Sequence, residues 1–248
     1  CGAETCVLPS AVLSTHTCGF SGYTFRDLTD DMPAIEKHWQ KEKISFDAVY
    51  TGYLGSAKQI AYVESIARNC LEKDGLLIVD PAMADNGKLY PGFDAAFVAE
   101  MKKLAAKADY LLPNLTEACL LTDTDYKTDY NQAYIEDVSE KLIALGAKTV
   151  VLTGVSYSAG KTGVVVFSDG KYEYYEHEKI AEGCHGTGDI YASAFTGALL
   201  RAAKAAEIAA NFVVECIKAT AGDHNHKYGA KFEKVLGKLI CAVDAITK

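Results

Sequence analysis

The sequence lacks the features that mark membrane proteins and nucleic-acid-binding proteins. No apolar run reaches the roughly 18 residues that a membrane-spanning helix needs, because charged residues interrupt the Ala-rich stretch from Ile190 to Thr220. The 33 Asp and Glu residues outnumber the 25 Lys and Arg residues, which gives a formal net charge of −8. Without a basic cluster, nucleic acid is not expected as the main partner. A small anionic substrate would need local positive groups or a metal ion.

The eight cysteines lack the spacing of a zinc site. None of them forms a Cys-x-x-Cys pair, which is a common source of zinc ligands. Four disulfides are conceivable, but a 248-residue chain with 49% hydrophobic residues can build a core without them. We therefore favour scattered reduced thiols in a cytoplasmic protein. The sequence shows no signal peptide.

Linkers, low-complexity tracts and repeats are also missing, so we expect one domain over residues 1–248. Strand-like and helix-like patterns alternate, as in a parallel sheet covered by helices. Strands are expected at residues 6–13, 48–51, 76–80, 110–112 and 149–153. Helices are expected at residues 33–43, 56–73, 93–107 and 131–145. After residue 153 the pattern changes: residues 163–167 and 172–177 alternate around Ser168-Asp169-Gly170, which predicts a β-hairpin.

The tetrapeptide Gly186-Thr187-Gly188-Asp189 comes between this hairpin and the Ala-rich stretch. Its two glycines allow a tight turn and a close approach of backbone N–H groups to a ligand. A helix that begins there would direct its unpaired amides and its positive dipole end toward a bound phosphate. Asp189 adds a carboxylate that could take a proton from an attacking hydroxyl, as phosphoryl transfer requires. The alternative is a simple tight turn in which Thr187 or Asp189 caps the helix.

Two more groups of polar residues follow expected strands. Asp80 opens the loop Asp80 to Tyr90 and could organise metal and phosphate, or the loop could simply be rich in turns. Glu117 follows Asn114 by three residues and could act through water on Mg²⁺; a capping box at a helix start is the alternative. Ligands of open α/β sheets bind at the carboxyl ends of strands. We therefore expect these residues to gather at one edge of the sheet.

The order of these segments resembles the ribokinase-like superfamily. In chain order they are Asp80-Pro81, Pro113-Asn114-Leu115-Thr116-Glu117, Thr153-Gly154-Val155 and Gly186-Thr187-Gly188-Asp189. The run from Asp80 to Tyr90 is similar to the Asp-Pro-x-Met-x-Asp-x-Gly-x-x-Tyr run of pyridoxal kinases. Ser14-Thr15-His16-Thr17 and Thr51-Gly52-Tyr53 are similar to two loops of those enzymes. The resemblance covers essentially the whole chain.

The resemblance implies a three-layer αβα sandwich with a mostly parallel central sheet. It also implies transfer of the γ-phosphoryl group of ATP to the 5′-hydroxymethyl group of a B6 vitamer: pyridoxal, pyridoxine or pyridoxamine. Mg²⁺ would assist, with a monovalent cation such as K⁺ as a further candidate, and the protein would be a cytoplasmic homodimer. Two alternatives stay open: a hydroxymethylpyrimidine kinase or other small-molecule kinase of the superfamily, and a non-catalytic homologue that binds nucleotide or vitamer.

The matching segments also imply roles for single residues. Asp189 would contact the substrate and act as general base, beside an anion hole formed by Gly186, Thr187 and Gly188. The metal would be served by Asp80 and Glu117. The nucleotide would lie against Asn114, Thr153, Gly154 and Val155. The vitamer would lie against Ser14, His16, Thr17 and Tyr53.

Two departures from the family pattern concern the start of the sequence. The chain opens at Cys1, and the resemblance implies a preceding strand and helix of about 30 residues, including a substrate-contacting Ser, that this sequence would lack. Cys18 is inserted between Thr17 and Gly19, where a local difference in the substrate loop is expected. Cys184 is expected to pack rather than to react, and His224 and His226 are expected in a solvated loop.

Overall fold

A six-stranded sheet forms the centre of the computed structural model, which describes residues 3–17, 19–181, 183–202, 204–223 and 226–246. The strand order is β10-β9-β8-β7-β4-β3. Four strands are parallel: β3 (Phe46–Thr51), β4 (Leu71–Val79), β7 (Tyr110–Leu111) and β8 (Thr149–Val155). The sheet continues in antiparallel pairing with β9 (Lys161–Ser168) and β10 (Lys171–Glu178). The expected mostly parallel sheet is confirmed.

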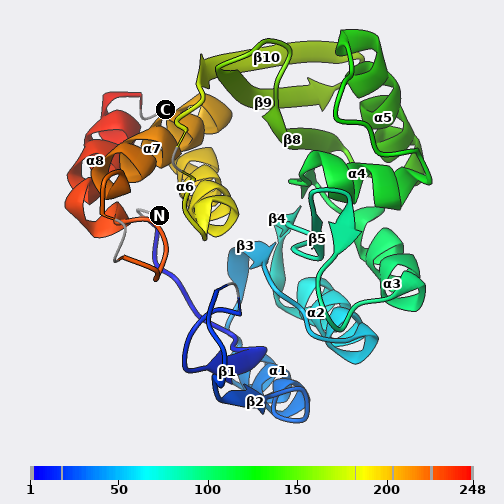
Figure 1. Ribbon diagram of the computed structural model, residues 1–248. Coiled ribbons are helices and arrows are strands. Elements are labelled where there is room, and N and C mark those ends of the chain that lie inside the picture. The colour runs from blue at the N-terminus through cyan, green and yellow to red at the C-terminus, as the bar shows by residue number, and fades with distance from the viewer. Residues whose placement is uncertain (1–2, 18, 182, 203, 224–225, 247–248) are drawn as a thin grey trace.

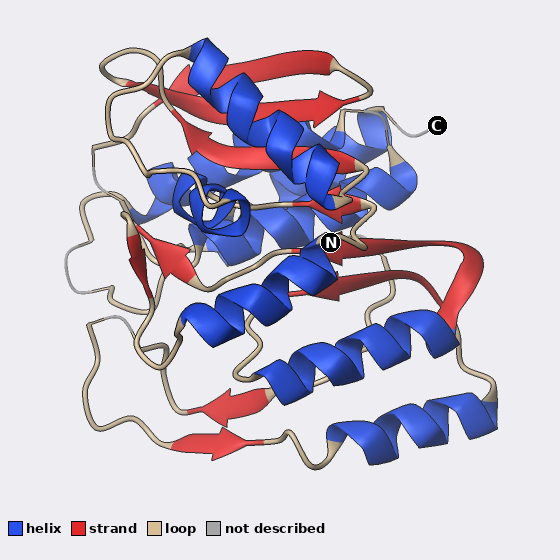
Figure 2. Ribbon diagram, turned by 90° about the vertical axis from the view of Figure 1, so that its right-hand side faces the viewer, coloured by secondary structure: helices blue, strands red, loops and turns tan. Residues whose placement is uncertain are grey.

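Helices cover both faces of this sheet, as Figures 1 and 2 show. One face carries α2 (Ala57–Cys70), α3 (Ala95–Ala105), α4 (Leu115–Thr122) and α5 (Gln132–Leu145), with α1 (Met32–Glu42) packed on α2. The other face carries α6 (Thr187–Arg201), α7 (Ala205–Thr220) and α8 (Leu236–Ala245). The three-layer αβα sandwich is therefore confirmed. In the described part of the chain, no helix is both long enough and apolar enough to cross a bilayer.

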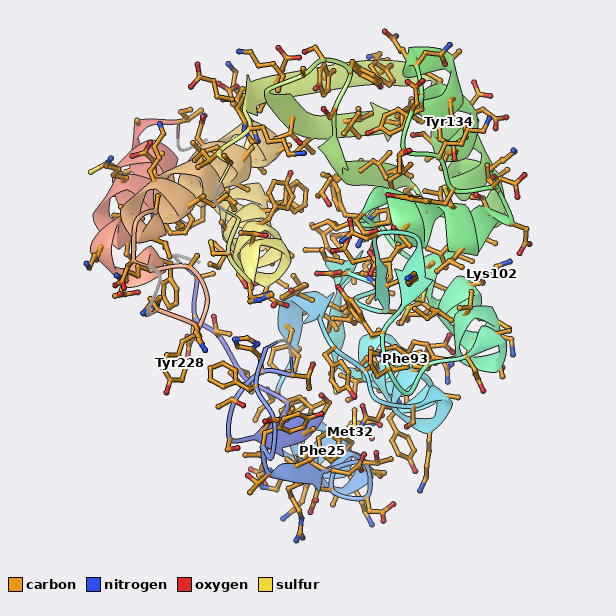
Figure 3. All side chains as sticks on the ribbon, in the orientation of Figure 1. Phe25, Met32, Phe93, Lys102, Tyr134 and Tyr228 are labelled. Carbon is orange, nitrogen blue, oxygen red and sulfur yellow. The ribbon has the colours of Figure 1, made fainter. Side chains whose placement is uncertain are left out.

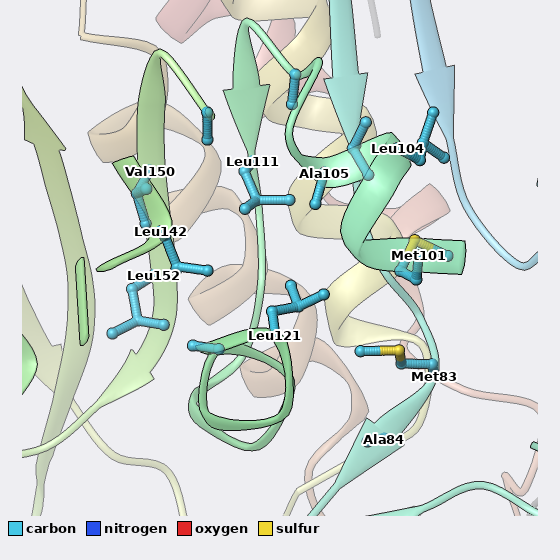
Figure 4. Packing of buried hydrophobic residues seen from close by; sticks show 14 of the residues in the cluster. Met83, Ala84, Met101, Leu104, Ala105, Leu111, Leu121, Leu142, Val150 and Leu152 are labelled. Carbon is cyan, nitrogen blue, oxygen red and sulfur yellow. The ribbon is translucent and has the colours of Figure 1, made fainter. Parts of the chain in front are cut away.

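Alternating side chains of the central strands pack against the helices on the two opposite faces of the sheet. In β8, Val150 and Leu152 are fully buried in the cluster with α3, α4 and α5, and Figure 4 shows them beside Leu111 of β7. Val151, between them, is buried in the opposite cluster with α6 and α7. Successive side chains of a strand point to opposite faces, so strands buried on both faces read as continuous apolar runs in the sequence.

The hairpin after residue 153 forms as the sequence predicts. Lys171 pairs with Ser168, so Asp169 and Gly170 alone make the turn between β9 and β10. Both residues have positive φ, +50° and +71°. Two positive φ values are what a two-residue turn needs to match the twist of the flanking strands. An Asp-Gly pair supplies them at little cost, which is why this prediction succeeds.

The prediction of a strand at residues 6–13 is wrong for most of its length. Only Ala11–Leu13 is a strand, β1, and it pairs antiparallel with β2 (Phe25–Asp27) in a separate two-stranded sheet. Pro9 lacks the N–H that a ladder needs and fixes its own φ, so the apolar run cannot continue as a strand through it. A second small hairpin, β5 (Ala84–Asp85) with β6 (Lys88–Leu89), lies in the loop after β4.

In the described residues, the C-terminal part contains three α helices, α6, α7 and α8. The Ala-rich stretch is divided into α6, which ends at Arg201, and α7, which begins at Ala205. A one-turn 3₁₀ helix at Phe232–Lys234 precedes α8. Six cysteines in the described residues carry free thiols, as expected: Cys6, Cys70, Cys119, Cys184, Cys216 and Cys241.

Gln59, a fully buried amide on α2, anchors the N-terminal arm to the sandwich. Its Oε1 accepts the backbone N–H of Gly55 (2.7 Å). Its Nε2 donates to the carbonyl of Ser10 (3.0 Å) and to Oγ1 of Thr29 (2.8 Å). One side chain thus fixes the position of the chain before β1, the chain after β2 and the turn that follows β3.

We expect Gln59→Met to lower the free energy of unfolding by about 2–4 kcal/mol, because it leaves three partner groups without their hydrogen bonds. Urea unfolding followed by circular dichroism measures the change. Gln132→Met is the matched control, since Gln132 is exposed and, among the described residues, its side chain bonds only Glu136 on its own helix (2.7 Å). Its effect should stay within about 0.5 kcal/mol. Equal losses in the two variants would contradict the anchoring role of Gln59.

Candidate active site

The Gly186-Thr187-Gly188-Asp189 turn forms the start of α6. Gly186 has a φ of +79°, a left-handed conformation that favours glycine, and it is the N-cap residue of the helix. No side chain caps this first turn, so the capping alternative for Thr187 and Asp189 is not what the structure shows. The first amides of α6 are directed outward at a positive helix end. This is the geometry of an anion site.

Three carboxylates meet near this turn. Asp189 is in the first turn of α6, Asp80 follows β4, and Glu117 is in the first turn of α4. Burial raises the pKa of Asp80 well above its usual value, and the negative charges of Glu117 and Asp189 raise it further. Desolvation also raises the pKa of Asp189, although that residue is exposed. The tip of one strand and the starts of two helices therefore share one negatively charged site.

Glu117 is the most constrained of the three. It is 2% exposed, and its Oε1 accepts the backbone N–H groups of Met83 (2.9 Å) and Ala84 (3.4 Å). Its Oε2 accepts the N–H of Asn114 (3.0 Å), while Oδ1 of Asn114 accepts the N–H of Glu117 (3.0 Å), so the capping box is present. Burial raises the pKa of Glu117 to about 7, against the lowering effect of these backbone hydrogen bonds.

Asp80 and Glu117 could also bind a hard cation, because each has a carboxylate oxygen that accepts at most one hydrogen bond. Oδ1 of Asp80 accepts the N–H of Ala82 (3.1 Å), and within the described residues its other oxygen has no partner. Oε2 of Glu117 accepts only one N–H. Mg²⁺ keeps several waters and takes few direct carboxylates, so these two residues would hold it largely through water. No group of three or more His, Cys, Asp or Glu side chains in the described residues forms a complete metal cage.

The residues assigned to the nucleotide line up at the carboxyl end of β8. Thr153 donates its N–H to the carbonyl of Pro113 (2.9 Å) and forms an isolated parallel β-bridge with Asn114. Gly154 is exposed with a φ of +74°. The other two contribute structure: Val155 is fully buried, and the Asn114 side chain is used by the capping box and by a bond to the carbonyl of Ala84 (2.8 Å).

The residues assigned to the vitamer lie on two loops near the N-terminal arm. Oγ of Ser14 accepts the N–H of Thr24 (2.9 Å), and Thr17 is exposed. The ring of Tyr53, 44% exposed, lies 5.9 Å from that of Phe93, which Figure 3 labels. Nε2 of His16 bonds the carbonyl of Lys227 (2.8 Å). Cys18 and His224 lie outside the described residues.

Neither Tyr50 nor His185 was singled out in the sequence analysis. Tyr50, on β3, bonds Ser193 of α6, and its pKa is raised by burial and by the nearby charges of Asp80 and Asp189. As an apolar-looking strand residue it gave no signal in the sequence. A pocket of about 440 Å³ also borders the turn on its His185 side. Its lining includes Cys184, whose thiol pKa is raised by burial, and His226.

Comparison with known proteins places this arrangement in a family. The phosphomethylpyrimidine kinase family profile matches residues 23–233. The chain belongs to that family. The predicted relationship to pyridoxal kinases of the ribokinase-like superfamily is also confirmed: Bacillus subtilis pyridoxine kinase is 31% identical over 184 residues, which cover 71% of this chain and 65% of that protein.

A second relative and a solved structure extend the comparison. Bacillus subtilis hydroxymethylpyrimidine/phosphomethylpyrimidine kinase is 30% identical over 224 residues, 86% of this chain and 78% of that protein. A Bacteroides thetaiotaomicron structure, assigned as a phosphomethylpyrimidine kinase, is 38% identical with a TM-score of 0.89, covering 94% of this chain and 83% of that one. The chain spans 55% of the Dictyostelium discoideum pyridoxal kinase that it matches, less than two thirds of that relative's length.

The pKa of Glu117 predicts how stability depends on pH without metal. Between the ordinary value of 4.5 and about 7, the folded protein keeps a proton that the unfolded chain has lost. This group's contribution is therefore fully present below pH 4.5 and is lost as the pH rises through about 7. Melting temperatures of the parent and of Glu117→Gln in EDTA measure it. The variant loses hydrogen bonds at every pH, but its deficit should shrink between pH 5 and 7.5. A deficit that stays constant would show that Glu117 does not titrate there.

Proposed function

We propose that this protein is a kinase that transfers the γ-phosphoryl group of ATP to the 5′-hydroxymethyl group of a B6 vitamer. The observation that carries the proposal is the position of Asp189. Its carboxylate is in the first turn of a helix whose outward amides have no side-chain cap, and it is close enough to Asp80 to raise that residue's pKa. An anion site, a base and metal-binding oxygens are thus combined at one edge of the sheet.

The chemistry assigns a task to each part. Asp189 takes the proton of the attacking hydroxyl, and desolvation, which raises its pKa, makes it a better base. The amides of Gly186, Thr187 and Gly188 receive the negative charge of the transferred group. Mg²⁺, held through Asp80 and Glu117, would neutralise phosphate charge. Phosphoryl transfer needs this positioning and charge neutralisation more than covalent catalysis.

The remaining assignments follow the same reasoning. The nucleotide lies along the carboxyl end of β8 at Thr153 and Gly154, with Asn114 and Val155 as structural support. The vitamer lies against Ser14, Thr17 and the Tyr53 ring. We further propose a single domain over residues 1–248, a cytoplasmic location, and a homodimer, which light scattering after size-exclusion chromatography would test. K⁺ is a further candidate cation.

A second candidate is a hydroxymethylpyrimidine kinase. It is favoured by the family profile and by the 30% identity to the Bacillus subtilis enzyme of that activity. A B6 vitamer is favoured by the pyridoxine kinase relative at 31% identity. It is also favoured by the Bacteroides thetaiotaomicron protein, 37% identical to this chain, whose structure was determined with pyridoxal.

Asp189→Asn should reduce turnover by about 10²–10⁴-fold, the usual contribution of a general base. Nucleotide affinity should change little, since the anion-hole amides remain. Steady-state kinetics and calorimetric titration with ADP measure the two quantities. Asp169→Asn, in the turn between β9 and β10, is the matched control. Near-parental turnover by Asp189→Asn would remove Asp189 from the role of base.

A substrate panel decides between the two kinases. ATP consumption is measured with pyridoxal, pyridoxine, pyridoxamine and hydroxymethylpyrimidine at equal concentrations, with and without Mg²⁺. We expect the highest kcat/KM with a B6 vitamer, and loss of turnover when EDTA removes the metal. A higher kcat/KM with hydroxymethylpyrimidine would assign the second activity, and consumption with no substrate of the panel would overturn both.

A further inference from the structure

Five aromatic rings from three distant segments form one cluster beside the turn, here called the ring cluster: His16, Phe20, His185, His226 and Tyr228. The His16 ring lies 4.9 Å from Phe20 and 5.1 Å from His185. Phe20 lies 5.4 Å from Tyr228, and Tyr228 lies 6.2 Å from His226. Figure 3 shows Tyr228 on the C-terminal segment, next to the N-terminal arm. The proposed substrate loop, the anion-hole turn and a C-terminal segment therefore meet here.

His16 is at the centre of the ring cluster and is held by three contacts. Besides its two ring neighbours, its Nε2 bonds the carbonyl oxygen of Lys227 at 2.8 Å, across 211 residues of sequence. A carbonyl only accepts hydrogen bonds, so Nε2 carries the proton. Nδ1 is buried and has no partner among the described residues. The imidazole thus joins the loop that contains Ser14 and Thr17 to the C-terminal segment.

The C-terminal segment, residues 226–231, also contacts the residue that precedes the Gly186-Thr187-Gly188-Asp189 turn. The N–H of Ala230 donates to the carbonyl of His185 (3.2 Å), the residue immediately before Gly186. Gly229 has a φ of +118°, and a Cβ there would lie 2.9 Å from the same carbonyl. The N–H of Lys231 donates to Oγ1 of Thr220 (2.8 Å), which fixes the far end of the segment to α7. A displacement of Lys227 would therefore be transmitted to His185 and Gly186.

We propose that His16 is a positioning residue that couples the substrate loop to the anion hole through Lys227, Ala230 and His185. It holds the two halves of the site in one geometry rather than contacting the reacting atoms. This assignment rests on the proposed function for its role in turnover, and it replaces the contact with the vitamer that the sequence resemblance implied for His16. The structural coupling itself can be measured without any substrate.

Hydrogen–deuterium exchange of the ligand-free protein is the direct test, with peptides covering residues 226–231 and 183–190. The exchange rates of the Ala230 and Ile190 amides measure the coupling, because these amides bond the carbonyls of His185 and Gly186. In His16→Ala we expect about tenfold faster exchange in both peptides, equivalent to about 1.4 kcal/mol of lost protection. His38→Ala, an exposed histidine on α1, should leave both unchanged. Unchanged exchange in His16→Ala would overturn the proposal.

Two further variants separate the hydrogen bond from the ring and guard against misfolding. His16→Asn keeps a donor for the Lys227 carbonyl, and His16→Phe keeps the ring packing. Each should show a smaller effect than His16→Ala, provided that the melting temperatures remain within a few degrees of the parent. If both variants remain folded and exchange as fast as His16→Ala, neither the hydrogen bond nor the ring packing carries the coupling and the proposal fails.

The kinetic signature distinguishes positioning from substrate contact. In His16→Ala, kcat should fall about tenfold while the KM for the vitamer changes less than threefold. A large rise in that KM with kcat unchanged would make His16 a substrate contact and overturn the proposal. If the parent phosphorylates no vitamer, the proposed function fails, and the exchange measurements still decide whether the coupling exists.

Discussion

The buried carboxylate of Glu117 is the constraint on which the site depends. Its two oxygens accept three backbone N–H groups that belong to two separate segments, the loop after β4 and the start of α4. The Asn114 amide closes the same joint by bonding the carbonyl of Ala84. Because these bonds fix the course of the loop, they also fix the position of Asp80 at its beginning. A substitution here would therefore disturb the geometry of the site as well as its charge.

In the described part of the chain, the three carboxylates of the site have no positive side chain paired with them. Within the described residues, Asp80, Glu117 and Asp189 form no ion pair with Lys, Arg or His. Burial without a positive partner is costly for Asp80 and Glu117, and their raised pKa values reflect that cost. Desolvation also raises the pKa of the more exposed Asp189. A polyphosphate would add further negative charge. A cation bound with it relieves both repulsions, so a metal–nucleotide complex fits this site better than free nucleotide does.

The sequence predicted those features that depend on neighbouring residues. The Asp169-Gly170 turn, the capping box of Asn114 and Glu117, and the helix that begins after Gly186 each follow from local backbone chemistry, and all three are present. For Glu117 the sequence offered capping and metal binding as alternatives. The structure shows that the capping box of Asn114 and Glu117 is present. In our proposal, Oε2 of Glu117, which accepts one N–H, also bonds the water shell of a metal ion.

The sequence could not predict features that depend on contacts between distant segments. Gln59 reads as one polar residue on a helix, but it is buried because Ser10 and Thr29 reach it from the N-terminal arm. Tyr50 reads as an ordinary strand residue, and only the packing of α6 on β3 brings it to Ser193 and Asp189. The strand predicted at residues 6–13 is not continuous because Pro9 interrupts the apolar run, and its missing N–H prevents a continuous ladder.

The bond between His16 and Lys227 has a consequence for the order in which the protein folds. Bringing together two points 211 residues apart in an unstructured chain costs about 5 kcal/mol of loop-closure entropy, far more than one hydrogen bond returns. The contact can therefore form only after the intervening sheet has already brought the two ends of the chain together. The His16–Lys227 contact is therefore expected to form late in folding and to be lost early when the fold loosens.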